Sequence, residues 1–560
     1  MSRNSMTTLG PRPPHRTPET TKTPLMRKLN FPWWLLPALA GLFFLNLNGF
    51  LLFDHDEGAF SEATRGMFER GDFITTYLND RLRFDKPILI YWLQAASIYV
   101  FDIEVWAFRL PSALAGILWS LAIFFFARRY LNEATATAAA LMAASALGIN
   151  AIAHVATADA VLNMFLATTL LCIYHYSQSP SNRLLLAIYA LMALGTLTKG
   201  PVAVAIPLLV ACLYYLSSGL KPQLLKALFY FPGWALYLAI AAPWYVLIYL
   251  DQGQAFIDGF FLKHNVNRFK NAMEGHDGGL LFYPLVLPFV LAPFGGLLIR
   301  ILPSIKHIRH GDGGDSDNNG QTLDRFLWIW FLVVLVLFSV ASTKLPHYIL
   351  YGCTPLVILM ARYRHWLSSR WLAAVFPTLF FALLAALPSL VPSIEASLTN
   401  PIEVAVAQRA AEYINQEFAM LAAGAGVLSL LLIFALRRLA PWLTLVLVGG
   451  VQALFVWLVL APAASEAQQR PVWEAAQFAR LLNEPIVTQS IDMPSFNVYL
   501  NRVTERRGLE VGEVGYGRED RIDIDHFETL FQSGPIMLVR RLPPPTPTLE
   551  APAQSEVTDE

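Results

Sequence analysis

The amino-acid sequence predicts an all-α polytopic membrane protein that ends in a small α/β domain. Of its 560 residues, 55% are hydrophobic and only 15% are charged, and the mean hydropathy is +0.46. Soluble globular proteins carry about 25% charged residues. Apolar runs long enough to cross a bilayer recur between residues 31 and 461, and the chain turns polar after them. These observations exclude an ordinary cytosolic enzyme and a disordered chain.

Charge and cysteine content exclude two further classes. Lys+Arg and Asp+Glu both number 41, so the net charge is zero and no global basic field exists to hold nucleic acid. The three cysteines, Cys172, Cys212 and Cys353, all lie in apolar runs. Their spacing fits neither a disulfide framework nor a zinc site. We therefore expect no nucleic-acid partner.

The apolar runs predict about thirteen membrane spans. Residues 1–30 are polar and basic and are expected to form a disordered cytoplasmic tail. The first run, Phe31–Phe53, is long enough to span, and no small-residue cleavage site follows it, so we interpret it as an uncleaved span. The further runs lie near 107–127, 134–155, 160–176, 184–198, 201–217, 228–250, 280–299, 326–341, 348–361, 371–391, 419–436 and 441–461.

One shorter apolar run, Ile88–Phe101, determines the predicted sidedness. A run of this length that begins after Pro87 suits an interfacial helix better than a span. If it does not span, all the basic loops fall on the cytoplasmic side, as the positive-inside rule requires, whereas the opposite assignment puts all of them outside. These loops carry Arg128, Arg129, Arg183, Lys221, Lys226, Arg300–Arg309, Arg362, Arg364, Arg370, Arg437 and Arg438.

The predicted outer side then carries the first loop, residues 54–106, and a soluble domain over residues 463–545. In that domain Pro471–Leu482 resembles a helix, and Pro485–Gln489 and Ile536–Val539 resemble short strands. Residues 546–560, beyond a Pro-rich stretch, are expected to be a disordered tail.

Ionisable side chains gather in the predicted outer loops. Charge near hydrocarbon is costly, so each such residue is a functional candidate by default. Cations matched with carboxylates suit an anionic lipid headgroup, because a departing phosphate needs positive charge and a hydroxyl nucleophile needs a carboxylate base. No Gly-rich phosphate loop is present. The set is Asp54, Asp56, Glu57, Asp85, Asp159, Lys86, Lys199, Lys263, Arg268, Lys270, Lys344, His264, His347 and Tyr348.

Each candidate also has a structural interpretation. The segment Asp56–Arg70 predicts an amphipathic helix lying on the membrane, ended by the following glycine, and Asp56 and Glu57 would cap its N-terminus. Lys86 could be a snorkelling side chain beside a helix-starting proline. Asp159 could mark a polar hairpin tip. One shared site explains the whole set, whereas these interpretations explain its members separately.

The first outer loop resembles that of polyprenyl-phosphate-sugar glycosyltransferases of the GT-C fold, which include protein O-mannosyltransferases. The resemblance is carried by Asp56-Glu57 followed by SEATRGMFERGDF, by LRFDKPILIYW and by FRLPSALAG. Thr198–Pro201 and Lys344–Tyr348 resemble the lipid A aminoarabinose transferase branch in particular. Within that branch Asp85 stands in place of Glu, and Ala59 and Phe60 stand in place of Arg-Tyr. The likeness covers roughly residues 30–350.

The resemblance implies a GT-C catalytic domain over residues 31–462 in the bacterial inner membrane, with its active site on the periplasmic side. It implies a sugar donor linked to undecaprenyl phosphate and an inverting transfer to an envelope acceptor such as lipid A. Asp56 matches the expected base, Glu57 belongs to the same acidic motif, and Asp159 matches a second acidic position. The expected substrate contacts are Lys86, Lys199, Arg268, Lys344, His347 and Tyr348. Asp85 and His264 could hold a divalent metal.

Other functions stay open at this point. A polyprenyl-lipid transporter or flippase is expected to contain internal repeats with paired broken helices, which we do not find in the sequence. A non-catalytic envelope assembly protein would not explain charges spread over six loops. The same enzyme class with a protein, another glycolipid or a polysaccharide as acceptor fits the residues equally well.

Overall fold

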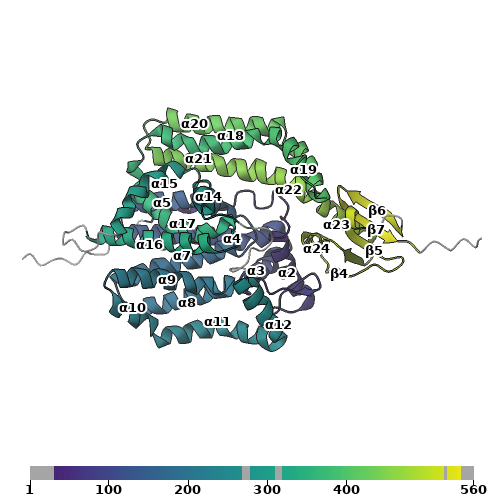
Figure 1. Ribbon diagram of the computed structural model, residues 1–560, viewed down its shortest axis with the longest axis horizontal. Coiled ribbons are helices and arrows are strands. Elements are labelled where there is room, and N and C mark those ends of the chain that lie inside the picture. Colours follow the sequence, from purple (N-terminus) through teal and green to yellow (C-terminus); the bar gives the residue numbers. More distant parts are fainter. Residues whose placement is uncertain (1–30, 268–277, 309–317, 523–525, 544–560) are drawn as a thin grey trace, which may run out of the picture.

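The computed structural model describes residues 31–267, 278–308, 318–522 and 526–543, except for the side chains of residues 264–267 and 318–321. A helical bundle carries a small sheet domain at one end (Figure 1). In the described part, seven helices are long and apolar enough to cross a membrane, or eight if the bent pair Glu133–Ser145 and Leu147–Ala153 counts as one span. The all-α polytopic class is confirmed, whereas the count of thirteen stays a prediction.

The bundle is built from helices that follow one another through short connections. Its first half contains α1 (Leu35–Phe43), α2 (Glu57–Arg70), α3 (Leu89–Phe101), α4 (Val105–Tyr130), α5 (Glu133–Ser145), α6 (Leu147–Ile152), α7 (Asp159–Gln178), α8 (Asn182–Lys199), α9 (Val202–Ser217), α10 (Lys221–Leu228) and α11 (Phe231–Gln252), with a two-stranded ribbon of β1 (Tyr77–Leu78) and β2 (Arg81–Leu82).

The second half contains α12 (Gln254–Phe256), η1 (Ile257–Asn267), α14 (Phe282–Val290), α15 (Gly295–Ile301), η2 (Leu302–Ile308), α16 (Asn318–Val340), η3 (Pro346–Gly352), α17 (Cys353–Arg362), η4 (Arg364–Trp366), α18 (Arg370–Glu395), α19 (Pro401–Tyr413), α20 (Gln416–Ala435), α21 (Pro441–Phe455), η5 (Val456–Leu460) and α22 (Ala461–Gln468).

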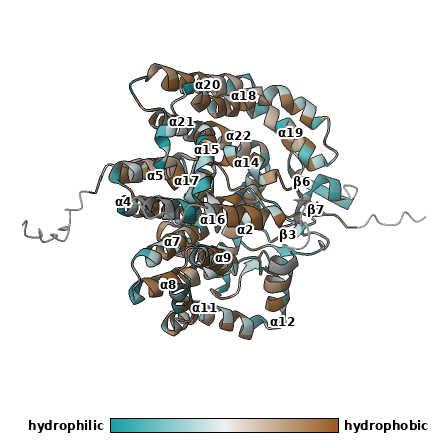
Figure 2. Ribbon diagram, turned by 60° about the vertical axis from the view of Figure 1, so that its left-hand side comes forward, coloured by the Kyte–Doolittle hydropathy of each residue, from teal (hydrophilic) through white to brown (hydrophobic). Residues whose placement is uncertain are grey.

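Small side chains allow the central helices to approach closely. α5 packs against α4, α17 and α21, and its alanines from Ala138 to Ala140 are fully buried. Close backbone approach through small residues is typical of membrane bundles. The helices are largely hydrophobic along their length (Figure 2). A helix that is apolar on every face is suited to such a buried position.

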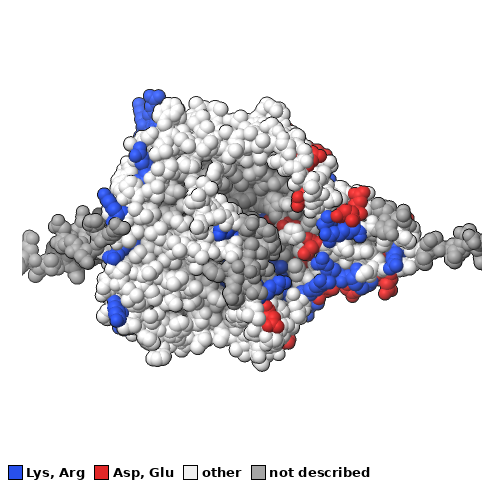
Figure 3. Space-filling view, viewed as in Figure 1, with Lys and Arg blue, Asp and Glu red and all other residues white. Residues whose placement is uncertain are grey.

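Basic residues mark one end of the bundle. Lys and Arg side chains line the end opposite the sheet domain (Figure 3). Arg128 and Arg129 lie in the last turn of α4, and Arg370 begins α18.

Helix α3 has 13 residues and therefore a length of about 20 Å. This length is short compared with a hydrocarbon core of about 30 Å.

The C-terminal domain is a mixed sheet with helices packed on it. Its elements are α23 (Arg470–Leu482), β3 (Ile486–Gln489), α24 (Ser495–Leu500), β4 (Glu505–Arg506), β5 (Val514–Arg518), η6 (Glu519–Arg521), β6 (Phe527–Ser533) and β7 (Ile536–Arg541), with strand order β4-β3-β5-β7-β6. Strands β4, β3 and β5 are parallel, whereas β7 is antiparallel to β5 and β6. The one helix and two strands expected from the sequence are confirmed.

Helix α2 is buried between the bundle and the C-terminal domain. It ends at Gly71 in a left-handed conformation, φ +68°, as the sequence predicts. Every residue from Glu57 to Met67 is buried, however, and α2 packs against α3 and α24. The expectation of a helix lying on the membrane surface was therefore wrong. Its charged face can be buried because Arg65 lies 2.7 Å from carboxylates of both Glu62 and Glu69.

Candidate functional site

Asp56 lies at the junction between the loop after α1 and the start of α2. It occupies the N-cap position, but its side chain makes no capping hydrogen bond, so the structural interpretation of this residue is not supported. The carboxylate forms no hydrogen bond and no ion pair with a described residue. His55 before it has a left-handed φ of +65°. Non-glycine residues seldom adopt this conformation, and such residues cluster at functional sites.

Glu57, the neighbour of Asp56, is fully engaged in the fold. Its two carboxylate oxygens accept hydrogen bonds from Arg109 Nε at 2.7 Å and Arg109 Nη2 at 2.8 Å, and both side chains are buried. The same carboxylate accepts the backbone N–H groups of Phe53 and Ala156. Glu57 therefore has no oxygen left for a substrate and acts as a brace for the loop that carries Asp56.

Asp159 and Lys199 form the second charged pair. Lys199 Nζ lies 2.5 Å from Asp159 Oδ1, and both side chains are only 12–13% exposed. Asp159 begins α7 and Lys199 ends α8, so each charge complements the macrodipole of its own helix. Tyr351 donates its hydroxyl to Asp159 at 3.4 Å, and His347 Nε2 lies 3.8 Å from the same carboxylate.

The aromatic residues of η3 cover this pair. The ammonium of Lys199 lies 5.4 Å from the ring centroid of Tyr348 and 5.8 Å from that of Tyr351. A cation within about 6 Å of a ring face is attracted by its quadrupole. The candidates Asp159, Lys199, His347 and Tyr348, taken from three separate segments, thus lie in one cluster.

A third cluster comes from the end of the first loop. Asp85 lies between two cations, with Arg83 Nη2 at 3.1 Å and Lys86 Nζ at 2.6 Å. Arg83 also contacts the hydroxyl of Tyr91 at 3.3 Å. The three charges leave one positive charge in excess, as a phosphate site requires.

Electrostatic interactions join the clusters around Asp56. Burial by the surrounding protein and the negative charge of Asp159 raise the pKa of Asp56, while Lys86 and Lys199 act in the opposite direction. A carboxylate with a raised pKa is a stronger base than an ordinary carboxylate. These electrostatic effects suit proton acceptance by Asp56 near cations that can hold an anion.

One of the expected residues, Lys344, is not part of these clusters. Lys344 is 6% exposed, and its ammonium donates to the carbonyls of Ser339 at 2.9 Å and Ala341 at 2.7 Å. It therefore satisfies carbonyls at and just after the C-terminal end of α16, which is a structural role, and the expected substrate contact stays a prediction. Arg268 and the side chain of His264 lie outside the described residues.

The expected metal site of Asp85 and His264 stays a prediction, because the side chain of His264 lies outside the described residues. Asp85 is held by two cations, which compete with a metal ion for its oxygens. Among the described side chains, no group of three or more His, Cys, Asp or Glu residues could hold a metal ion. We therefore derive no step of the reaction through a metal.

Sequence reasoning missed several residues of the site, among them Arg109 and Tyr351. Arg109 lies in the first turns of a long apolar helix, and a charge at that depth is itself a signal. Tyr351 gave no such signal, because a tyrosine in an apolar run is ordinary.

Part of the chain matches a known protein family. Residues 85–247 match the family described as dolichyl-phosphate-mannose-protein mannosyltransferase. The structure of ArnT from Cupriavidus metallidurans bound to undecaprenyl phosphate superposes with a TM-score of 0.73 at 20% identity, covering 90% of this chain and 97% of that chain. This chain has the GT-C fold. The fold inferred from the first outer loop is thereby confirmed.

Two relatives are similar in sequence to part of the chain. The undecaprenyl phosphate-alpha-4-amino-4-deoxy-L-arabinose arabinosyl transferase of Yersinia enterocolitica is 29% identical over 338 residues. An uncharacterized protein of Aquifex aeolicus is 29% identical over 333 residues, which is 59% of this chain and 72% of that protein. The match spans 58% of the length of the Yersinia protein.

Proposed function

We propose that the protein is a membrane glycosyltransferase that transfers a sugar from a donor in which the sugar is linked to a polyprenyl phosphate, such as undecaprenyl phosphate, to an envelope acceptor such as lipid A. The observation that carries the proposal is the unengaged carboxylate of Asp56 beside cations from two other segments, Lys86 and Lys199. The names of the arabinosyl transferase relatives and the undecaprenyl phosphate bound to the ArnT structure support this donor class.

Asp56 acts as the general base in an inverting displacement. The acceptor hydroxyl gives its proton to the Asp56 carboxylate, and the hydroxyl oxygen attacks the anomeric carbon of the donor sugar. The new bond is carbon–oxygen, and the bond from the anomeric carbon to the phosphate oxygen breaks with its electron pair on that oxygen. Asp159 holds Lys199 in place, and Glu57 fixes the loop of Asp56 through Arg109.

The departing polyprenyl phosphate gains negative charge, which needs preorganised cations. Lys86 and Lys199 supply two of them, and His347 and Tyr348 lie beside Lys199 as hydrogen-bond donors. Arg268 is the third cation in this proposal.

We assign the active site and the C-terminal domain to the periplasmic face of the inner membrane and the N-terminus to the cytoplasm. The assignment is supported by the basic helix ends at the opposite end of the bundle (Figure 3), since cytoplasmic loops carry an excess of Lys and Arg.

The test uses purified full-length protein in liposomes with a panel of undecaprenyl-phosphate sugars and lipid A as acceptor. The wild type should release undecaprenyl phosphate, and Asp56→Asn should abolish release while the protein stays folded. Glu104→Gln, at an exposed carboxylate of the same outer loop, is the matched control and should behave as wild type. Transfer by Asp56→Asn would overturn the assignment of the base, and bound donor with no transfer to lipid A or to a protein acceptor would favour a carrier.

A further inference from the structure

A cavity of about 140 Å³ lies between α7, α8, α9, α10 and α11, away from the charged clusters of the proposed active site. The described residues that line it carry no charge and no amide. It reaches the outer surface of the bundle, because its lining residues Leu208 and Trp234 are 42% and 37% exposed. An apolar cavity of this size stays dry and takes up apolar groups. It has room for part of one hydrocarbon chain rather than for a whole drug-sized molecule.

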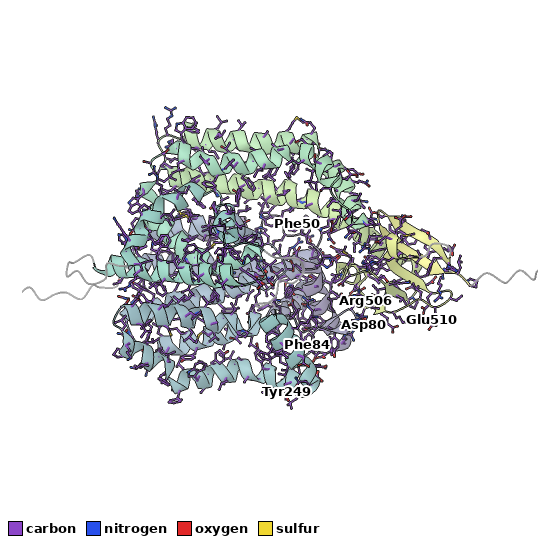
Figure 4. All side chains as sticks on the ribbon, in the orientation of Figure 1. Phe50, Asp80, Phe84, Tyr249, Arg506 and Glu510 are labelled. Carbon is purple, nitrogen blue, oxygen red and sulfur yellow. The ribbon has the colours of Figure 1, made fainter. Side chains whose placement is uncertain are left out.

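The cavity lies in the half of the bundle that ends in basic residues. It reaches α10, at the end opposite the sheet domain (Figure 1). On α11 Trp234 and Tyr249 are both partly exposed, and Tyr249 lies toward the end that carries the sheet domain (Figure 4). Their separation along the helix corresponds to about 22 Å, and Trp and Tyr are enriched at both membrane interfaces. Trp234 therefore marks the headgroup level at the basic end.

One tyrosine hydroxyl in the cavity wall has no partner. Of the three tyrosines that line the cavity, Tyr189 and Tyr215 donate to the carbonyls of Ala227 and Ile173, both at 2.8 Å. The third, Tyr176, is 1% exposed, and its buried hydroxyl has no hydrogen-bond partner among the described residues. A buried water needs about two to four polar partners, which the apolar wall does not supply. Because a buried polar group without a partner is costly, an acceptor on a bound molecule would stabilise this site.

Basic side chains lie beside the cavity at the membrane surface. Leu224 and Ala227 of α10 line it, and Lys221 and Lys226 of the same helix are exposed. Arg183 is exposed in the first turn of α8, another helix of the wall. Basic residues beside a pocket between membrane helices attract anionic lipid headgroups.

We propose that this cavity binds one acyl chain of an anionic phospholipid from the leaflet at the basic end of the bundle, with Tyr176 donating to an ester carbonyl of the lipid and with Lys221 and Lys226 facing its phosphate. Tyr176 lies in the last turn of α7, close to the boundary between headgroups and acyl chains, where the ester groups of a phospholipid lie. One ester-linked chain supplies hydrocarbon for the cavity, an acceptor for the hydroxyl and negative charge for the lysines. The site is remote from Asp56, so the inference does not depend on the proposed transfer.

Binding is measured by quenching of tryptophan fluorescence, with the full-length protein in phosphatidylcholine nanodiscs. The probes are phosphatidylglycerol and phosphatidylcholine with a brominated acyl chain, and brominated stearic acid. The signal of Trp234 is the difference between a protein and the same protein with Trp234→Phe. Phosphatidylglycerol should reach half-saturation at a mole fraction at least about tenfold lower than either other probe, because it alone combines an ester carbonyl with a phosphate that bears net charge.

Three variants separate the parts of the site. Tyr176→Phe keeps the shape of the wall and removes only the hydroxyl, and it should weaken phosphatidylglycerol binding about three- to tenfold. Lys221→Gln/Lys226→Gln should abolish the preference for phosphatidylglycerol over phosphatidylcholine. Ala211→Phe, which places a ring in the cavity, should abolish saturable quenching of Trp234. Tyr176→Phe is decisive even if Ala211→Phe does not fold.

Two controls test whether the effect belongs to this cavity. Lys306→Gln/Arg438→Gln removes two exposed cations outside α7–α11 and should bind as wild type. Trp371, 78% exposed at the start of α18, reports ordinary contact with lipid, and its quenching should be the same in wild type and in Tyr176→Phe.

Each other outcome overturns the inference. Equal binding of phosphatidylcholine would leave the lysines without a role, and equal binding of stearic acid would make the cavity a fatty-acid site. An undiminished affinity in Tyr176→Phe would place the acyl chain elsewhere. Asp56→Asn should bind phosphatidylglycerol as wild type does, so failure of the proposed transfer and failure of this inference are distinguishable.

Discussion

Arg109 and Glu57 form a fully buried, two-point ion pair that ties α4 to the first turn of α2. The guanidinium also donates to the carbonyls of Leu47 and Phe50. The pair therefore fixes both sides of the loop that presents Asp56. The pair holds the loop in place, and neither side chain takes part in the proposed transfer.

Loss of one partner of this pair should unfold the site. Arg109→Met leaves the Glu57 charge buried without a partner, and breaking a buried pair costs about 3–5 kcal/mol. We expect a lower temperature of thermal unfolding in detergent and loss of transfer. The double variant Glu57→Gln/Arg109→Met should regain part of the stability, since no charge is left buried. An Arg109→Met protein with the same unfolding temperature as Glu104→Gln would contradict the structural role of the Arg109–Glu57 pair.

Transfer should depend on pH through Asp56. Its pKa is raised, chiefly by burial and by the charge of Asp159. A base must be ionised, so kcat/KM should fall as the pH is lowered through this raised pKa. Lys86 lowers the pKa of Asp56, so Lys86→Met should move the acid limb of the profile to higher pH. Arg81→Gln, at an exposed cation of the same loop, should leave the limb in place, and an unshifted limb in Lys86→Met would argue against Asp56 as the titrating base.

Lys344 and Lys199 should differ in what their removal changes. Lys344→Met leaves two carbonyls at the end of α16 without their donor, at a cost of about 1–3 kcal/mol. We expect a lower unfolding temperature with an unchanged KM for the donor. Lys199→Met should raise that KM or lower kcat. A raised KM for the donor in Lys344→Met would support the substrate contact that the sequence predicts for Lys344.

Docking of the C-terminal domain should weaken as the pH rises. Asp54 accepts the backbone N–H and hydroxyl of Ser495, and burial raises its pKa from 3.8 to about 7, while His55 lowers it and Asp492 raises it. A carboxyl group with a raised pKa in the folded state stabilises that state at low pH, and this contribution is lost as the pH rises from about 4 through about 7.

The unfolding temperature should therefore be lower at pH 8 than at pH 6. Asp54→Asn keeps an acceptor for Ser495 and removes the titrating group, so the difference should shrink. Part of it should persist, because the pKa of Glu62 is also raised to about 7. An Asp54→Asn protein with the full pH dependence of wild type would exclude Asp54 as its source.

Sequence reasoning succeeded where the signal is local. The end of α2 at Gly71 follows from the freedom of glycine at positive φ, and the strand at Ile536 from a short run of apolar residues. It failed for the surroundings of α2, because the side chains that cover this helix come from α24, more than 400 positions later.

By itself the sequence determined the class of the protein, the positions of its apolar helices and the set of charges from which the site is built. Hydropathy and helical periodicity are properties of consecutive residues, so a single chain displays them. Only the tertiary structure decided that Glu57 braces the loop whereas Asp56 stays unengaged, and that Lys344 caps a helix whereas Lys199 meets Asp159. Two residues of the same type can have different roles because their partners differ. Partners such as Glu57 and Arg109 come together only when the chain has folded.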